Sequence, residues 1–334
     1  MSVEPRRPTL IDVARLAQVA PSTASRALKE SPRISEATRL RVRAAARGLG
    51  YQPNRVAQSL RAKTAPFVGI VVPDIGITFY SRVVKGAQEV LEAAGYQALV
   101  MNTEREAGYE EAALRTPEGH QVSGILLATS RPKSAEPHLP TVYFDSLAAG
   151  GGIAQIALAN DQGMELLVGH LVEHGHTRIA YIGGPPIFTS GQERLAGFRT
   201  ATERHGVRRG AAYVEIADSS WSADSAAAAM ARLLALAEAP TAVVASGDTL
   251  AMGAIAACRA AGRRVPDDIA LVAFDDPLFG ALVDPPMTAL RRSDHELGRE
   301  AAQLLLDGLD AEIATQTVRL PVALVVRRSC GCSS

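Results

Sequence analysis

Short aliphatic runs alternate with helix-length stretches from Phe67 to the end of the chain. The first run, Phe67-Val-Gly-Ile-Val-Val-Pro, is almost continuously apolar, as expected of a strand buried on both faces of a parallel sheet. Repeated strand–helix units place helices on both faces of such a sheet. The pattern restarts after Asn160-Asp161, so the sequence predicts an α/β core of two doubly wound parallel-sheet lobes.

The alternation also predicts where the individual elements lie. We expect strands at 67–73, 97–101, 124–128, 141–144, 153–159, 178–182, 213–217, 241–245, 269–274 and 287–291, and closing strands around 318–326. We expect helices at 79–94, 109–115, 163–173, 192–205, 223–237, 249–261 and 295–309.

The N-terminal residues have a helical period instead. Thr9 and Asp12 have capping-box spacing, and apolar residues follow on one helical face. A second helix begins at Pro21, which the first turn tolerates, and a third begins after Ser35, a good N-cap. Two short helices with a tight connection and a supporting third predict an all-α helix-turn-helix head, whose second helix enters the major groove of DNA.

Charge is divided unevenly between this head and the rest of the chain. The net charge is zero, but residues 1–63 contain 13 Lys and Arg against 4 Asp and Glu, and the remainder contains 22 against 31. A basic N-terminal module on an acidic body is typical of a protein that binds nucleic acid phosphates.

A very short helix is predicted after the head. Pro53 and Asn54 end one element, and Asn54 can cap the next, Arg55–Arg61. Two turns are too short for a stable isolated helix, so we expect it to form on DNA against a partner copy. Leu60 is an apolar side chain suited to wedge into a minor-groove step.

The motifs of residues 9–61 resemble those of the LacI/GalR family of ligand-responsive transcriptional regulators. The resemblance is carried, in order, by Asp-Val-Ala-Arg-Leu-Ala, Ser-Arg-Ala-Leu, Gly-Tyr-Gln-Pro-Asn-Arg-Val-Ala and Ser-Leu-Arg, and it continues along nearly the whole chain. It implies a periplasmic-binding-protein-like core, with chain crossings near 160–161, 290–292 and 319–321. The implied domains are a helix-turn-helix domain (1–52), a hinge helix and linker (53–66), an N-terminal lobe (67–160 with 292–319) and a C-terminal lobe (161–291 with 320–330).

The resemblance also implies which residues contact DNA. Pro21 and Ser22 align with base-reading positions of the family, and Arg26 can make a bidentate contact to guanine. Thr23, Ser25 and Arg55 are candidates for phosphate contacts, and Asn54 and Leu60 belong to the hinge. The family usually has Ser where this chain has Ala20, which removes a helix cap and a phosphate contact.

An effector site is expected between the lobes, where ligands of doubly wound sheets bind. Arg194 matches the ligand-binding arginine of the family, and Asp145 and Asp275 each follow a strand, where a carboxylate can accept hydrogen bonds from hydroxyls. Phe79 and Trp221 can stack on a sugar or base ring. Arg292 stands where the lactose-repressor type has glutamine, and an additional cation there would favour an acidic or phosphorylated effector.

The predicted function is therefore a DNA-binding transcriptional regulator, a repressor, in which a sugar-like or nucleoside-like effector controls operator affinity. The predicted partners are double-stranded operator DNA, the effector and a second copy of the chain in a homodimer. The alternative is a sugar-binding component of a transport system, which leaves residues 9–61 unexplained. An enzyme is disfavoured because the sequence contains no nucleophile elbow, dinucleotide fingerprint or phosphate loop.

No metal, cofactor or membrane segment is expected. Three cysteines do not make a disulfide framework, and Cys330 and Cys332 are interpreted as part of a tail. His170, His174 and His176 lack the metalloprotease spacing and a third ligand, so we interpret them as part of a helix end. The chain has no apolar run long enough to span a membrane and no export signal, which predicts a cytoplasmic protein.

Overall fold

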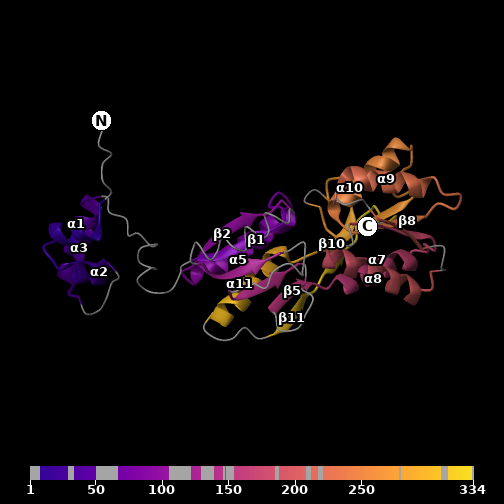
Figure 1. The fold of residues 1–334 in the computed structure, drawn as a ribbon. Helices are drawn as coiled ribbons and strands as arrows, with labels where there is room; N and C mark the ends of the chain where they lie inside the picture. Colours follow the sequence, from indigo (N-terminus) through magenta and orange to yellow (C-terminus); the bar gives the residue numbers. More distant parts are fainter. Residues whose placement is uncertain are drawn as a thin grey trace. The chain divides into compact units, whose positions relative to one another are not determined.

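The computed structural model describes residues 8–28, 34–49, 67–104, 122–128, 139–145, 147, 154–184, 188–207, 212–216, 221–277, 280–309 and 315–332. They belong to two compact units, Met1–Pro66 and Phe67–Ser334 (Figure 1). The hinge helix predicted at 55–61 and the helix predicted at 109–115 lie outside the described residues. Within those residues, no helix combines the length and the apolar character that crossing a lipid bilayer requires.

The described residues of the first unit form three helices around a small core of their own. The helices are α1 (Leu10–Leu16), α2 (Pro21–Leu28) and α3 (Glu36–Gly48). The predicted capping box is present, since Thr9 and Asp12 each accept a hydrogen bond from the other's backbone N–H. Ser35 caps α3 by accepting from the Thr38 N–H at 3.4 Å. The core consists of alanine and valine side chains, which let short helices pack closely: Val13, Ala14, Ala17, Ala24, Ala27, Val42, Ala45 and Ala46.

The second unit begins with a six-stranded parallel sheet, the N-terminal lobe. Its strand order is β11-β5-β4-β3-β1-β2, and each adjacent pair is parallel. The strands are β1 (Phe67–Val72), β2 (Gln97–Asn102), β3 (Val122–Leu127), β4 (Thr141–Phe144), β5 (Ala154–Leu158) and β11 (Gln316–Leu320), and the helices are α5 (Thr78–Ala93) and α11 (Asp294–Leu309). Strands β1, β3, β4 and β5 are almost entirely buried, as their continuous apolar sequences predict.

Helices α5 and α11 touch through their backbones, because each has a glycine at the contact. A Cβ atom on Gly86 would lie 1.9 Å from the carbonyl oxygen of His295, and a Cβ atom on Gly298 would lie 1.9 Å from that of Val83. Any side chain at either position would therefore force the helices apart. This contact joins two segments that are about 200 residues apart in the sequence.

The C-terminal lobe is a second six-stranded sheet of order β12-β10-β9-β8-β6-β7, parallel except for the antiparallel β12. Its strands are β6 (Ile179–Gly183), β7 (Ala212–Ile216), β8 (Ala242–Ala245), β9 (Ala270–Ala273), β10 (Thr288–Arg291) and β12 (Ala323–Val325). Its helices are α7 (Asn160–Glu173), α8 (Thr189–Arg204), α9 (Ala223–Leu234) and α10 (Asp248–Ala260). Figure 1 shows α9 and α10 on one side of this sheet and α7 and α8 on the other, the doubly wound arrangement.

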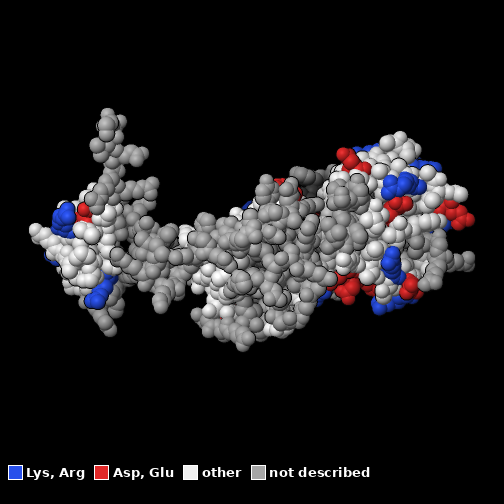
Figure 2. Space-filling model, in the orientation of Figure 1, with Lys and Arg blue, Asp and Glu red and all other residues white. Residues whose placement is uncertain are grey.

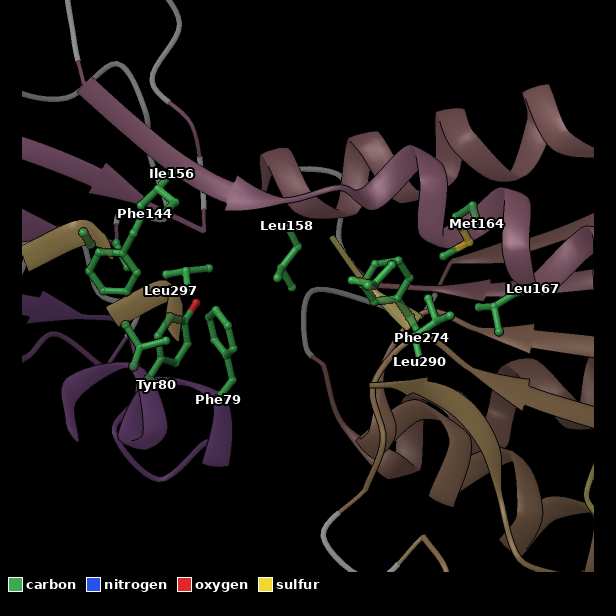
Figure 3. Close-up of a cluster of buried hydrophobic side chains, with 14 of the residues drawn as sticks. Phe79, Tyr80, Phe144, Ile156, Leu158, Met164, Leu167, Phe274, Leu290 and Leu297 are labelled. Carbon is green, nitrogen blue, oxygen red and sulfur yellow. The ribbon is translucent and has the colours of Figure 1, made fainter. Parts of the chain in front are cut away.

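The chain passes between the two sheets three times, after β5, after β10 and after β11. One hydrophobic cluster extends across the first crossing. Figure 3 shows Leu158, the last residue of β5, between a group around Phe144 in the N-terminal lobe and a group around Phe274 in the C-terminal lobe. Leu158 is only 2% exposed, so the lobes share apolar packing at their connection.

Three helix bounds differ from the prediction by three residues, for physical reasons. Helix α7 begins at Asn160 instead of 163, and α8 begins at Thr189 instead of 192. Both first turns are polar, so the apolar period starts one turn late: Asn160 of α7 forms hydrogen bonds with Glu193 and Arg194, and Ser190 of α8 lines the space between the lobes. Helix α9 ends at Leu234 instead of 237, and the next leucine, Leu236, is exposed and so adds little packing to extend it.

The interpretation of Cys330 and Cys332 as part of a tail is wrong. Cys330 is 1% exposed and belongs to the large hydrophobic cluster, with Cys332 packed beside it. The helix-end interpretation of the histidines is confirmed in part, since α7 ends at Glu173 with His174 as its C-cap, and Gly175 follows with φ of +85°, a left-handed conformation that glycine adopts freely. The structure adds a contact that spacing in the sequence does not reveal, between His170 and Cys332.

Candidate functional site

A cleft with a volume of about 490 Å³ lies between the lobes of the second unit. Side chains at its wall come from the carboxyl ends of strands in both sheets. From the N-terminal lobe they include Asp74, Phe79, Tyr80 and Asp145, and from the C-terminal lobe Phe188, Ser190, Arg194, Trp221, Asp248, Asp275 and Arg292. This is the position at which doubly wound sheets bind ligands.

Arg194, on the first turns of α8, is fixed from several sides although it is only 4% exposed. Its Nε donates to Asn160 Oδ1 at 3.0 Å, and its Nη1 donates to the Ser246 carbonyl and lies 3.6 Å from Asp275 Oδ1. The guanidinium carbon lies 3.8 Å from the centroid of the Phe274 ring. A guanidinium held in one orientation can present its remaining N–H groups to a ligand at little cost in side-chain entropy.

Arg292, directly after β10, is bound to two carboxylates. Its Nη1 lies 2.7 Å from Asp275 Oδ1, and its Nε lies 3.1 Å from Asp294 Oδ1. Burial alone would lower the pKa of Arg292, but the negative charges of Asp275 and Asp294 raise it by more. The pKa of Arg292 is therefore above its ordinary value. Burial raises the pKa of Asp294, against the opposing charge of Arg292. Arg292 is therefore not an additional uncompensated cation, and the predicted preference for an acidic or phosphorylated effector loses its basis.

Asp145 follows β4 with φ of +65°, in the left-handed region, which turns its carboxylate into the cleft. The hydroxyl of Tyr80 donates to its Oδ2 at 2.8 Å. Burial raises the pKa of Asp145, and the positive charge of Arg194 opposes that shift. Across the cleft, burial and the charge of Asp275 raise the pKa of Asp248.

Trp221 packs against the backbone at two strand ends. A Cβ atom on Gly184 would lie 2.2 Å from Trp221, and one on Gly247 would lie 3.3 Å from it. These glycines leave room for the indole ring beside the cleft. Phe79 lies on the other lobe, with the Arg292 guanidinium 4.7 Å from its ring centroid.

All six residues predicted from the sequence for effector binding, Phe79, Asp145, Arg194, Trp221, Asp275 and Arg292, line this cleft. Sequence reasoning missed Tyr80, Phe188, Ser190 and Asp248, which line it as well. Each of these residues lies in the first turn of a helix or just before it, directly after a strand and its loop. That position in a strand–helix unit is the signal that could have identified them.

The candidate DNA-binding surface lies on the first unit. Pro21, Ser22 and Arg26 of α2 are exposed, and Thr23 and Ser25 are half-buried. The helix packs inward through Ala24 and Ala27. Asn54, Arg55 and Leu60 lie outside the described residues.

The positive charge of this unit favours the binding of a polyanion. Its described residues contain six arginines, Arg15, Arg26, Arg39, Arg41, Arg43 and Arg47, against two carboxylates, Asp12 and Glu36. Figure 2 shows basic side chains exposed on its surface. Such a surface attracts nucleic acid phosphates.

Two family models match this chain. The lacI family of bacterial regulatory proteins matches residues 9–54, and a periplasmic binding protein-like domain matches residues 168–330. The HTH-type transcriptional regulator CelR of Thermobifida fusca is 35% identical over 345 residues, with 97% of this chain and 98% of the relative covered. The HTH-type transcriptional repressor CytR of Escherichia coli (strain K12) is 32% identical over 342 residues, with 96% of both chains covered.

Solved structures of similar transcriptional regulators also match nearly the whole chain. The lac repressor dimer bound to operator and the anti-inducer ONPF matches with a TM-score of 0.88 and 28% identity, over 97% of this chain and 99% of that chain. The complex of the transcriptional regulator CelR with cellobiose matches with a TM-score of 0.72 and 32% identity, over 97% of this chain and 100% of that chain. The similarity includes the N-terminal unit as well as the two lobes.

Proposed function

The chain belongs to the LacI family of bacterial regulatory proteins and is a DNA-binding transcriptional regulator, and we propose that its effector is a neutral, hydroxyl-rich molecule. This effector would bind in the cleft and control how tightly the protein binds operator DNA and so represses transcription. The alternative of a transport component leaves the helix-turn-helix unit without a role. We further propose that the cleft binds its ligand without transforming it. The similar proteins named above, which cover nearly the whole chain, are transcriptional regulators and repressors.

One hydrogen-bonded network supports the allosteric part of this proposal. Asn160, at the first crossing, accepts from Arg194 Nε and donates to Glu193 Oε2 at 2.7 Å. Glu193 in turn accepts from Arg319 Nη1 at 2.8 Å, and Arg319 belongs to β11 of the other lobe. The proposed ligand-binding arginine is thus connected through two side chains to the third crossing. A ligand that changes the position of Arg194 will bias the angle between the lobes.

Charge and aromatic groups in the cleft support a neutral effector. Its described wall has four carboxylates, Asp74, Asp145, Asp248 and Asp275, against two guanidinium groups, both of which already bind Asp275. Carboxylates accept hydrogen bonds from hydroxyl groups, whereas an anionic ligand would be repelled. Trp221 and Phe79 supply apolar faces for a ring. A neutral sugar combines both properties, and the similar CelR structure contains cellobiose.

We propose that two copies of the chain pair and place their heads on a pseudo-palindromic operator, the assembly found in the similar lac repressor dimer. Arg26 would read a base, Pro21 and Ser22 would begin the reading helix, and Thr23, Ser25 and Arg55 would contact phosphates. Asn54 and Leu60 would act in the hinge. We propose lobe limits at 160–161, 291–292 and 319–320, and Asn160 and Arg319 of the hydrogen-bonded network lie at the first and the third of these limits. Such coupling changes operator affinity by about 1–3 kcal/mol.

Thermal shift of the full-length protein tests the effector class. We would compare cellobiose, a sugar phosphate and a nucleoside, and extend the panel to other neutral sugars. A ligand at about 100 times its Kd stabilises the folded state by about 2.7 kcal/mol. We expect the stabilising compound to be neutral, and we expect Arg194→Gln to abolish its effect.

Arg204→Gln is the matched control, since Arg204 lies on the same helix but is exposed and pairs with Glu165 outside the cleft. A gel shift with genomic fragments, with and without the stabilising sugar, then tests coupling to DNA. Stabilisation by sugar phosphates alone, or equal losses in both arginine variants, would contradict the proposed site. No retarded fragment at low salt would contradict operator binding.

A further inference from the structure

The last described residues form a fixed turn against the C-terminal sheet, here called the C-terminal turn (residues 327–332). Arg327 makes two hydrogen bonds to the Asp276 carboxylate, at 2.7 and 2.8 Å. The buried hydroxyl of Ser329 donates to the Leu271 carbonyl at 2.6 Å and accepts from the Thr288 N–H at 2.8 Å. These contacts tie the turn to both β9 and β10, so the two cysteines within it have defined positions.

Three possible metal ligands meet where this turn contacts α7. Gly331, between the cysteines, has φ of +88°, and this turn brings Cys330 Sγ within 3.1 Å of Cys332 Sγ. Cys332 Sγ lies 3.4 Å from His170 Nε2. The three ligand atoms all lie within 4.8 Å of one another. None of these residues lines the effector cleft.

The spacing fits tetrahedral coordination. Zn–S bonds of about 2.3 Å and Zn–N bonds of about 2.1 Å place neighbouring ligand atoms about 3.5–3.8 Å apart. The two separations in the structure, 3.1 and 3.4 Å, need only small side-chain adjustments to reach these values. Two thiolates and one imidazole form a donor set that favours zinc over magnesium or calcium, which prefer oxygen ligands.

Neighbouring groups hold these ligands in place. The hydroxyl of Thr288 lies 3.1 Å from Cys330 Sγ, to which it can donate. The ring of His176 lies beside the turn, with its Nδ1 3.0 Å from the Thr241 hydroxyl. His174 donates from Nδ1 to the His170 carbonyl at 2.7 Å, which fixes the last turn of α7. Contacts of this kind orient metal ligands in proteins.

We propose that His170, Cys330 and Cys332 form a structural zinc site that cross-links the last turn of α7 to the C-terminal turn. Each thiol releases its proton to solvent when Zn²⁺ binds, and water completes the coordination. The cation thereby connects the helix that begins at the first crossing to the end of the chain. The site does not depend on the identity of the effector or on DNA binding.

Metal binding to the reduced full-length protein tests this proposal. Zn²⁺ would be titrated in competition with a chromogenic chelator, and Co²⁺ would be added as a probe whose absorption reports thiolate ligands. We expect one Zn²⁺ per chain and a thiolate-to-cobalt charge-transfer band. Cys332→Ser and His170→Asn should each weaken Zn²⁺ binding by about tenfold or more. Zn²⁺ should also raise the melting temperature of the wild type but not of these variants.

The matched control is Cys258→Ala, because Cys258 is buried in a separate hydrophobic cluster. It should retain Zn²⁺ binding, and circular dichroism would verify that every variant is folded. The proposal is overturned if the reduced wild type binds no Zn²⁺, or if Cys258→Ala loses as much affinity as Cys332→Ser. Mass spectrometry would show a disulfide between Cys330 and Cys332 as a loss of two hydrogens. The proposal is also overturned if that disulfide forms and the protein does not bind Zn²⁺ after reduction.

Discussion

Gly298→Ala is expected to destabilise the second unit through a backbone clash between α11 and α5. The added Cβ would lie 1.9 Å from the carbonyl oxygen of Val83 and 2.9 Å from the backbone nitrogen of Ala87. Heavy atoms in contact are normally about 3.5 Å apart, so the helices must separate by about 1.5 Å. The obstacle is backbone inside a helix, which cannot rotate away as a side-chain tip can.

The magnitude follows from two opposing effects. Overpacking costs about 1–3 kcal/mol, and a gap of about 1 Å between the helices also forfeits up to half of the dispersion energy of the contacts it opens. Alanine regains about 1 kcal/mol over glycine in helix propensity. We expect a net loss of about 2 kcal/mol. At about 2–4 °C per kcal/mol for a unit of this size, the melting temperature should fall by about 4–8 °C.

Calorimetry of the full chain measures this change. Gly48→Ala is the control, since Gly48 is also helical but a Cβ there would meet no atom within 4 Å. Because Gly48 lies in the first unit, the second unit's melting temperature should not change in that variant. If Gly298→Ala melted at or above the wild-type temperature, the contact between α5 and α11 would not be as close as the structure describes.

Three further predictions concern the two proposed sites. Arg26→Ala should relax operator specificity at one base pair by about 1–3 kcal/mol, measured by gel shift on a set of single-base operator variants; a uniform loss on every sequence would indicate a phosphate contact instead. Arg292→Met should lower the unfolding free energy by about 3–5 kcal/mol, because Asp275 and Asp294 both lose a buried ion-pair partner. Urea titration measures this change, and an unchanged midpoint would contradict it. Burial raises the pKa of Asp145 in the folded protein, so the contribution of this group to stability is lost as pH rises through that pKa. Asp145→Asn should therefore reduce the fall in melting temperature between acidic and mildly basic pH, and an unchanged pH profile would refute the assignment.

The strand–helix order was predictable because buried parallel strands have a strong apolar signal. The strand at Thr141–Phe144 has the predicted bounds, and most other elements differ by one to three residues. The first turns of α7 and α8 were missed because polar residues, Asn160 and Ser190 among them, replace the apolar period on which the prediction depends.

Contacts between segments far apart in the sequence could not be predicted from the sequence pattern. A charge at Arg292 can be identified from the sequence, but its neutralisation by Asp275 and Asp294 depends on how a strand end and a helix start fold together. In the same way, His170 and Cys332 are 162 positions apart, and only the fold brings them into contact. The sequence therefore predicted well which residues face the cleft. It did not predict which of their charges are paired with an opposite charge.

The three crossings between the lobes have a consequence for synthesis on the ribosome. The N-terminal sheet obtains its edge strand β11 and its covering helix α11 only after almost all of the C-terminal lobe has been translated. Until then, Gly86 of α5 has no partner helix, and the face of the sheet that α11 covers stays open to water. Neither lobe can finish folding on a nascent chain that stops before residue 316, so both must complete their folding at nearly the same time, once β11 and β12 have been synthesised.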